Sequence, residues 1–164
     1  MRTLDTNGLR LCEYQAKLFE ASVDRFNCST NIFLRRFYYS NLLSILDKNN
    51  SALLSLDVNE GLDEIEMQFG KSDYGKNKIN KEILFWVGYI YRYISYTRNA
   101  NTQFLFKTFE YKKLFELYQI YHTQDPEWCV KSLLELYDLN EDFFDLNYRL
   151  KQVMKKYNDK SKVS

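Results

Sequence analysis

Apolar residues recur along this chain at spacings of three and four, which is the period of an amphipathic helix. The first apolar stripe covers residues 9–26. A second stripe begins at Ser29 or Thr30, whose hydroxyl can cap the free amides of a first helical turn, and it reaches Leu46 with a break near Ser40. The pattern therefore predicts two helices at the start of the chain, the second of them interrupted.

The segment 57–69 surrounds a short apolar stripe with acidic residues, most of them early in the segment. Because the helix dipole favours negative charge near a helix N-terminus, this distribution indicates a helix that begins near Asp57. Gly70 follows as a suitable C-cap, and the polar residues 71–78 predict a loop. Asn80 can then cap the next helix.

Residues 81–99 are the most apolar segment and are aromatic or aliphatic nearly all round. Such a segment is typical of a helix that neighbours cover on most sides, and it is far longer than a usual strand. Charged residues within and beside it, such as Glu82 and Arg92, argue against a membrane span. We therefore expect a central helix here.

The second half of the chain predicts further helices. Asn101 or Thr102 can cap one or two helices that end near Tyr121. Asp125, followed by Pro126 at the first helical position, is the clearest helix start in the sequence, because proline lacks only an amide that would have no partner there.

A last helix is predicted after an Asn140 cap, and it is expected to fade into a basic tail after Tyr157. Its apolar residues are expected to face inward: Phe143, Phe144, Leu146, Leu150 and Val153. Residues 149–164 contain six basic side chains and one acidic one, so they carry +5 while the preceding residues carry −4. The favoured interpretation is a solvated helix end, and binding of phosphate or an acidic partner is the alternative.

These elements predict an all-α fold, a single-domain helical bundle of about six to eight helices around the central aromatic helix 81–99. A length of 164 residues suits one domain. We assign residues 1–157 to this domain and residues 158–164 to a basic, flexible tail. The predicted core contains Phe19, Phe33, Phe37, Leu84, Val87, Ile90, Ile94, Leu114, Leu117 and Leu133.

Composition and charge restrict the classes of function. The net charge of +1 gives no electrostatic footprint for nucleic acid, so a nucleic-acid partner is possible but not favoured. Three cysteines without CxxC spacing and a single histidine predict neither a metal site nor a cofactor, and they indicate a reduced, cytoplasmic protein with buried thiols. No long apolar window is free of charge, so no membrane partner is expected.

One face of the central helix carries four aromatic residues: Trp86, Tyr89, Tyr93 and Tyr96. Aromatic stripes at helical spacing are usually core. The alternative is a groove for a partner, since tyrosine and tryptophan combine a large contact area with a polar group. In that alternative Arg92 stacks on neighbouring rings or emerges as a charged anchor.

Two further patterns carry candidate chemistry. Arg35 and Arg36 lie on the second helix of a possible helix-turn-helix, but the turn lacks its usual glycine and the helix is too apolar to read a DNA groove. His122 and Asp125 could orient a general base, but no motif places a nucleophile nearby, so the favoured role of His122 is to bind the last carbonyls of a helix. We therefore expect a protein that is not an enzyme.

Four sequence blocks resemble, in order and spacing, a family of small bacterial proteins described as antitoxin or antitoxin-like. The blocks are EYQAKLFE, IFLRRFYYSNL, FGKSDYGKNKINKEILFWVGYIYRY and LYQIYHTQDPEWCVKSLLE. The resemblance covers about residues 13–135. The family carries a second tryptophan at the position of Ile94, and its members end near residue 135, so the helix from Glu141 onward is an extension.

The resemblance implies a non-enzymatic cytoplasmic protein that neutralises a co-encoded toxin by direct binding. The alternatives are a phage or mobile-element inhibitor of a host defence enzyme, and a nucleic-acid-binding regulator. The partner-binding residues are predicted on one surface, with two on a loop and three on the central helix: Tyr74, Lys76, Tyr89, Arg92 and Tyr93. An exposed tyrosine groove there would also suit a homodimer.

Overall fold

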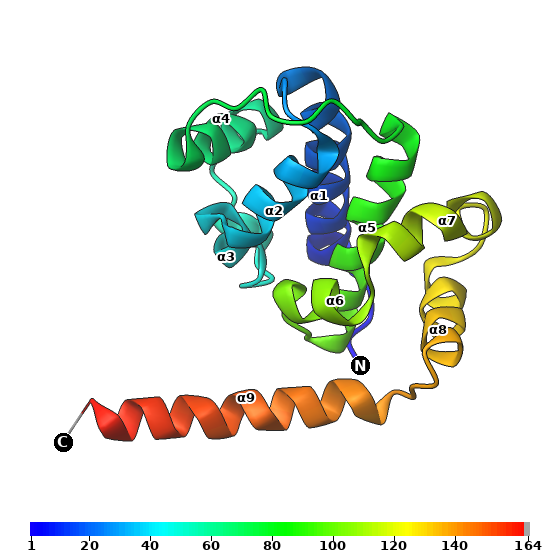
Figure 1. Ribbon diagram of the computed structural model, residues 1–164. Helices are drawn as coiled ribbons and strands as arrows, with labels where there is room; N and C mark the ends of the chain where they lie inside the picture. Colours follow the sequence, from blue (N-terminus) through cyan, green and yellow to red (C-terminus); the bar gives the residue numbers. More distant parts are fainter. Residues whose placement is uncertain (163–164) are drawn as a thin grey trace.

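The computed structural model describes residues 1–162, and these residues are all-helical, with no strand (Figure 1). The α-helices are α1 (Thr6–Arg25), α2 (Thr30–Tyr39), α3 (Asn41–Leu46), α4 (Val58–Phe69), α5 (Lys81–Arg98), α6 (Thr102–Thr108), α7 (Tyr111–Tyr121), α8 (Pro126–Leu136) and α9 (Asp142–Ser161), with a 3-10 turn η1 (Ser51–Leu53) before α4. The predicted helical bundle is therefore confirmed.

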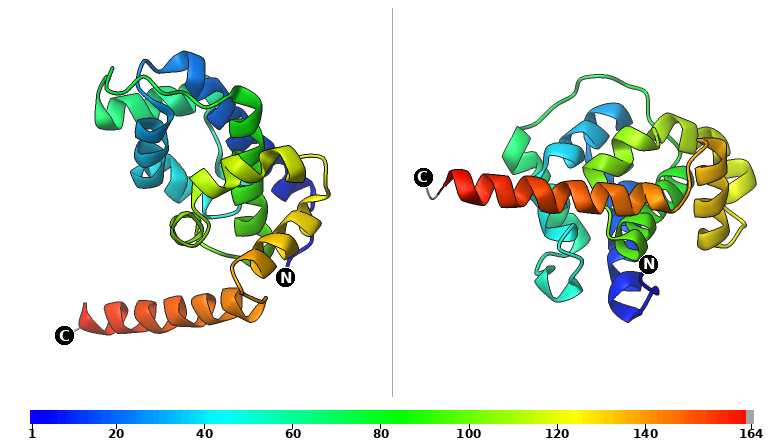
Figure 2. Two further views of the ribbon diagram at one scale, coloured as in Figure 1. Left: turned by 45° about the vertical axis from the view of Figure 1, so that its right-hand side comes forward. Right: turned by 90° about the horizontal axis from the view of Figure 1, so that it is seen from below.

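Helix α5 is the centre of the bundle and pairs with α1 along its length. The two backbones approach each other at Gly88, where an added Cβ atom would lie 2.9 Å from the carbonyl oxygen of Gln15 and 3.1 Å from the Cα of Ala16. Every residue from Ile90 to Arg98 is buried. Helices α2 and α4 pack against α1, helices α6, α7 and α8 pack against α5, and α3 packs on α2 and α4 (Figures 1 and 2).

Side-chain caps set most of the helix boundaries. Asp57 and Glu60 form a capping box at the start of α4, and Gly70 ends that helix at a φ of 79°. The expected break at Ser40 is confirmed, because Ser40 ends α2 and its hydroxyl accepts a hydrogen bond from the amide of Leu43 in α3. This break and a second one between α6 and α7 raise the number of α-helices among the described residues to nine, above the six to eight predicted.

The predicted core is confirmed with one exception. Nine of the ten named residues are buried, and Leu117 is only partly buried. Phe19 of α1 lies edge-on to two rings of α2, with ring centroids 5.6 Å from Phe33 and 4.9 Å from Phe37. These aromatic contacts join α1 and α2 in a geometry that adds to the burial energy.

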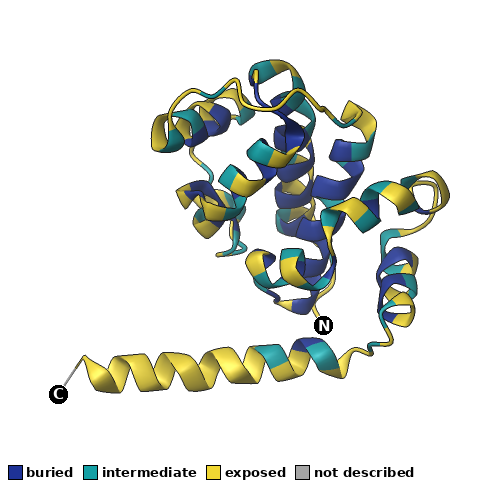
Figure 3. Cartoon of the chain, in the orientation of Figure 1, coloured by how far each residue is buried: buried dark blue, intermediate teal, exposed yellow. Residues whose placement is uncertain are grey.

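Helix α9 departs from the prediction. Phe144 is buried and Phe143 partly so, but Leu146, Leu150 and Val153 are 59%, 54% and 50% exposed (Figure 3). The expectation that these three side chains face inward is wrong, because α9 extends away from the bundle and no residue among 1–162 covers them (Figure 1). The helix also continues past Tyr157 to Ser161, so residues 158–161 of the predicted flexible tail are helical. Residues 163 and 164 of that tail lie outside the described part.

Candidate functional site

The loop between α4 and α5 is attached to the start of α2. The amide of Ser29 donates to the carbonyl of Tyr74 at 3.1 Å, and the amide of Thr30 donates to the carbonyl of Asn77 at 3.0 Å. Gly75 has a φ of 76°, and an added Cβ atom would lie 2.7 Å from the Ser29 hydroxyl, so the close approach requires glycine. The loop therefore presents Tyr74 in a fixed place while its side chain is 74% exposed.

Two adjacent hollows lie along the outer side of α2. The first, of about 490 Å³, is lined by residues of α2, α6 and the start of α7; the second, of about 440 Å³, is lined by α2, the end of α4 and the loop. Both share Ile32, Arg35 and Tyr39. We call the two hollows together the α2 groove, lined by Asn31, Ile32, Leu34, Arg35, Arg36, Tyr38, Tyr39, Phe69, Ser72, Tyr74, Phe106, Lys107 and Tyr111.

Packed aromatic rings form the floor of the α2 groove. The ring of Phe106 lies 5.8 Å from Tyr38 and 6.3 Å from Phe37, which anchors it to the core. Tyr39 packs edge-on against Tyr38 at 4.7 Å and remains 59% exposed. The groove is thus preformed and offers tyrosine surface to a partner.

The charge of the groove is positive. Arg36 donates to the carbonyl of Gly70 at 2.5 Å and lies over the ring of Phe69 at 5.9 Å. Arg35 and Lys107 are exposed, and neither forms a hydrogen bond or ion pair with another residue in the described part of the chain. Two cations therefore remain free to meet acidic groups of a ligand.

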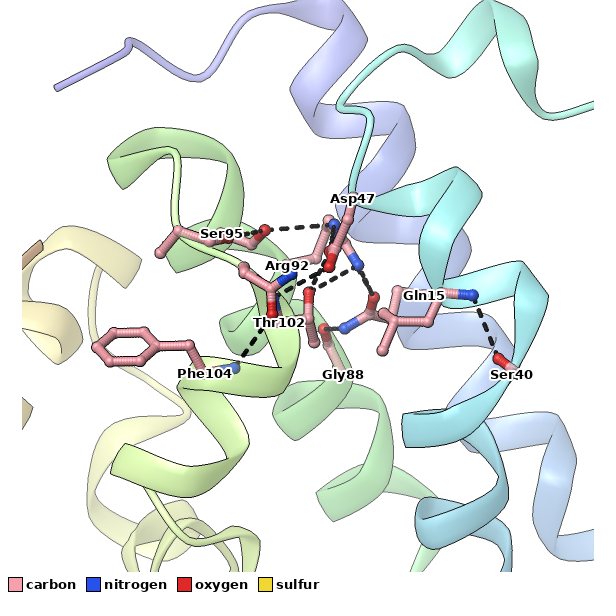
Figure 4. Close-up of polar contacts among 11 residues, drawn as sticks. Gln15, Ser40, Asp47, Gly88, Arg92, Ser95, Thr102 and Phe104 are labelled. Atoms are coloured by element: carbon pink, nitrogen blue, oxygen red, sulfur yellow. Dashed lines mark hydrogen bonds and ion pairs between the residues drawn. The ribbon is translucent and has the colours of Figure 1, made fainter. Parts of the chain in front are cut away.

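Arg92 does not belong to this surface, contrary to prediction: its side chain is 0% exposed and lies among polar groups that include Gln15 and Asp47 (Figure 4). Its Nε and one Nη donate to Gln15 at 2.9 and 2.8 Å, and the Nη atoms also donate to Asp47 at 2.9 Å, Ser95 at 3.3 Å and Thr102 at 3.0 Å. All five N–H donors of the guanidinium are used within the protein. Arg92 therefore has no donor left for a partner.

The residues around Arg92 are themselves hydrogen-bonded. Asp47 accepts from the hydroxyl of Thr102 at 2.5 Å and from its amide at 3.2 Å, and Gln15 donates to the carbonyl of Gly88 at 3.0 Å. Burial lowers the pKa of Arg92, and the charge of Asp47 opposes that shift. The network connects α1, the end of α3, α5 and the start of α6, so its role is to fix these helices relative to one another.

The tyrosines of α5 are also covered. Tyr93 is 8% exposed and its hydroxyl donates to Glu127 at 3.0 Å, while Tyr89 is half-buried. Burial raises the pKa of Tyr89 to about 12 and that of Tyr93 further. The aromatic face of α5 therefore belongs to the core. The prediction that Arg92 and Tyr93 share an exposed binding surface with Tyr74 and Lys76 is wrong. Of the five predicted residues, Tyr74 and Lys76 are exposed.

A second buried arginine joins α5 to α8 and to the start of α9. The Arg98 guanidinium donates two bonds to Glu127, at 2.7 and 2.5 Å, and two to Glu141, at 2.7 and 3.2 Å. The hydrogen bonds from Arg98 hold the pKa of Glu127 below its usual value, with a further contribution from Tyr93. This bidentate geometry is the strong form of an ion pair.

The lowered pKa of Glu127 gives a test of this pair. Because the pKa of Glu127 is lower in the folded protein than in the unfolded chain, its ionised carboxylate stabilises the fold. This contribution is fully present above the unfolded-state pKa near 4.5 and is lost as the pH falls through the folded-state pKa. We expect Glu127→Gln to lower the free energy of unfolding by about 1–2 kcal/mol at pH 7. In urea titrations the gap between wild type and variant should narrow toward pH 3. An unchanged gap, or an equal loss in the exposed control Glu135→Gln, would contradict the assignment.

His122 and Asp125 serve the helix ends. The Nδ1 of His122 lies 2.6 Å from the carbonyl of Tyr118, and its ring stacks on Tyr118, which confirms the capping role. Asp125 accepts from the amides of Glu127 and Trp128 at the start of α8. Both side chains are engaged by their own helices and are not arranged as a base and its orienting acid.

The thiols are buried and free. Burial raises the pKa of Cys12 to about 12 and that of Cys129 to about 11, which keeps both thiols protonated. Among residues 1–162, no three His, Cys, Asp or Glu side chains are grouped to bind a metal ion. No described helix combines the length and apolarity needed to cross a bilayer.

Comparison with protein-family models, curated protein sequences and solved structures finds no match to this chain. The resemblance to antitoxin-like proteins therefore stays a prediction. The candidate site is the α2 groove, of which the sequence predicted only Tyr74 as a binding residue. The signal for the rest was present in the RRFYY run of residues 35–39, where two cations precede three aromatic residues.

Proposed function

We propose that this chain is a non-catalytic, antitoxin-like inhibitor that binds a protein toxin through the α2 groove and blocks it by occlusion. The observation that carries the proposal is a preformed groove with exposed Tyr39 and Tyr74 beside the unpaired Arg35. Tyrosine and arginine are the residue types most often found at the energetic centre of protein interfaces. The resemblance of residues 13–135 to antitoxin-like proteins points in the same direction.

The groove also indicates the chemistry of the partner. Its aromatic floor favours an apolar or aromatic segment, and its free cations, Arg35 and Lys107, favour acidic residues beside that segment. Because the groove lies between helices and a loop that is hydrogen-bonded to α2, its residues lose little conformational entropy when a partner binds. We therefore propose a partner that inserts an apolar segment flanked by Asp or Glu.

Co-expression tests the proposal directly. The gene adjacent to the one that encodes this chain would be expressed alone and together with it, and growth would be followed. We expect growth arrest by the neighbouring product alone and relief when this chain is present. Growth arrest that this chain does not relieve would reject neutralisation of that product, and capture of a host defence enzyme instead would favour the phage-inhibitor alternative.

Substitutions in the groove test where binding takes place. We expect Tyr39→Ala and Tyr74→Ala each to weaken partner binding by about 1–3 kcal/mol, the usual range for a truncated interface tyrosine. Calorimetric titration measures this loss. Because Tyr74 is 74% exposed, its replacement should leave the melting temperature nearly unchanged.

Tyr148→Ala is the matched control, since Tyr148 is 45% exposed but lies on α9, away from the groove. It should bind as the wild type does. If all three variants protect cells equally well, the binding surface lies elsewhere on the molecule.

A single-stranded nucleic acid is the second candidate ligand, because exposed tyrosines beside free cations resemble a stacking platform. Such binding falls steeply with salt concentration, because each neutralised phosphate releases counterions. A gel shift with labelled single strands of DNA and RNA at low and high salt distinguishes the two. Retardation at low salt that Tyr39→Ala abolishes would favour nucleic acid.

A further inference from the structure

Helix α9 carries an apolar stripe that no residue in the described part of the chain covers. Its members recur at spacings of four, three and four: Leu146, Leu150, Val153 and Tyr157. Each is at least half exposed, and every residue from 148 to 161 is exposed (Figure 3). Spacings that alternate between three and four are those of the a and d positions of a coiled coil.

Residues 148–160 of α9 are exposed and so bury little of the apolar face that normally keeps a helix folded. An isolated helix of about 12–15 residues is only marginally stable in water, and most helical stability in proteins comes from packing of the apolar face. The chain exposes 9853 Å², whereas a compact monomer of 19.8 kDa exposes about 8,600 Å². The excess surface is larger than the roughly 800 Å² that each partner buries in a standard interface.

Charge along α9 and the turn before it is segregated. The N-terminal part is acidic, with Asp138, Glu141, Asp142 and Asp145 and no basic residue. The C-terminal part, from Arg149 onward, contains six basic side chains and one acidic one. Two copies of this helix side by side in parallel would align like charges, whereas an antiparallel pair would place the basic end of each helix beside the acidic end of the other.

We propose that the stripe on α9 pairs with α9 of a second copy of this chain, in antiparallel orientation. With Leu146 opposite Leu150 of the other copy, Val153 meets Phe143, and Tyr157 reaches the turn before α9, which contains Leu139. The same register brings the acidic Asp142 to Lys156 of the second copy at the flanking positions where coiled coils form salt bridges.

A hollow beside the start of α9 can accept the C-terminal end of α9 from the second copy. The hollow, of about 640 Å³, lies beside the first turns of α9, next to the apolar stripe. It is lined by Asp138, Leu139, Asn140, Asp142, Phe143, Asp145, Leu146 and Arg149. Three aspartates around an apolar floor match the basic and aromatic end of α9, where Tyr157 lies between Lys156 and Lys160.

Sedimentation equilibrium of the full chain tests the pairing. We expect a dimer at micromolar concentration and a Kd that rises about tenfold or more in Leu150→Asp, the effect of removing one central anchor. The matched control is Gln152→Asp, which adds the same charge two residues away on the opposite side of the helix and should leave the Kd unchanged. A monomer at all concentrations, or a dimer that Leu150→Asp does not weaken, would overturn the proposal.

Charge exchange tests the orientation. In the antiparallel pair, Lys156→Glu faces an aspartate and should weaken the dimer, and adding Asp142→Lys in the same chain should restore it. In a parallel pair, Lys156→Glu would relieve repulsion and strengthen the dimer, which would reject the antiparallel arrangement. Because none of these residues lines the α2 groove, the dimer and the proposed toxin binding can fail independently.

Discussion

Replacing Arg92 with methionine should destabilise the protein more than any other single change to its polar residues. Removing one partner of a buried ion pair leaves the other uncompensated and typically lowers the free energy of unfolding by about 3–5 kcal/mol. Here Asp47, only 15% exposed, loses its charge partner, and Gln15 and Thr102 lose hydrogen bonds. Since a domain of this kind is stable by about 5–15 kcal/mol, chemical denaturation should show a loss of a large fraction of that stability.

Two further variants test whether the loss of stability comes from the buried network. Arg35→Met removes an exposed arginine that has no partner among residues 1–162 and should change stability by less than about 0.5 kcal/mol. Arg92→Lys keeps the charge but cannot supply five donors in a fixed plane, so it should also destabilise. An Arg92→Met protein that unfolds at the same denaturant concentration as the wild type would show that the network is not a structural element.

Phe19→Ala should have an effect of similar size on the apolar core. Phe19 is fully buried, lies edge-on to Phe33 and Phe37, and is the side chain that a Cβ atom at Gly88 would meet at 3.0 Å. Its truncation leaves a cavity where α1, α2 and α5 meet, and we expect a loss of about 3–5 kcal/mol in the free energy of unfolding.

The measurement is denaturant unfolding followed by circular dichroism, with Tyr148→Ala as the control for loss of an exposed ring. That control should remain within about 0.5 kcal/mol of the wild type. A loss below about 1 kcal/mol for Phe19→Ala would mean that the packing of α1 against α2 is looser than these ring distances indicate.

Local chemistry made most of the helices predictable. The cap at Asp57, the Gly70 end and the Asp125–Pro126 start are short-range signals, and each marks an observed boundary. The approach of α1 to α5 at Gly88 was not predictable, because it depends on residues more than 70 positions apart.

The sequence predicts Arg92 on the surface because arginine beside tyrosines is typical of interface anchors. Its burial depends on Gln15, Asp47 and Thr102, which come from three other parts of the chain and share no sequence motif. The prediction that the apolar stripe on α9 faces the core is wrong for a different reason. The spacing of apolar residues shows that one face of a helix packs against something, but it does not show whether that partner belongs to the same molecule.

The candidate site was predicted in part. Tyr74 was identified because a tyrosine flanked by lysines on a loop has no evident core role. The pattern around Tyr39 and Arg35 indicates a helix too apolar to read DNA, but the same residues suit a protein partner. Their juxtaposition with Tyr74 depends on the loop bonds to Ser29 and Thr30, which are tertiary contacts.

Hydrogen–deuterium exchange of the chain alone and in complex with a protein partner identified by co-expression is the most direct test of the central claim, the proposal that the α2 groove is the binding surface. We expect slower exchange on binding in α2, in the loop around Tyr74 and at the α6–α7 junction, with exchange in α8 unchanged. Protection confined to α8 or α9, with the groove exchanging as in the free protein, would contradict the claim.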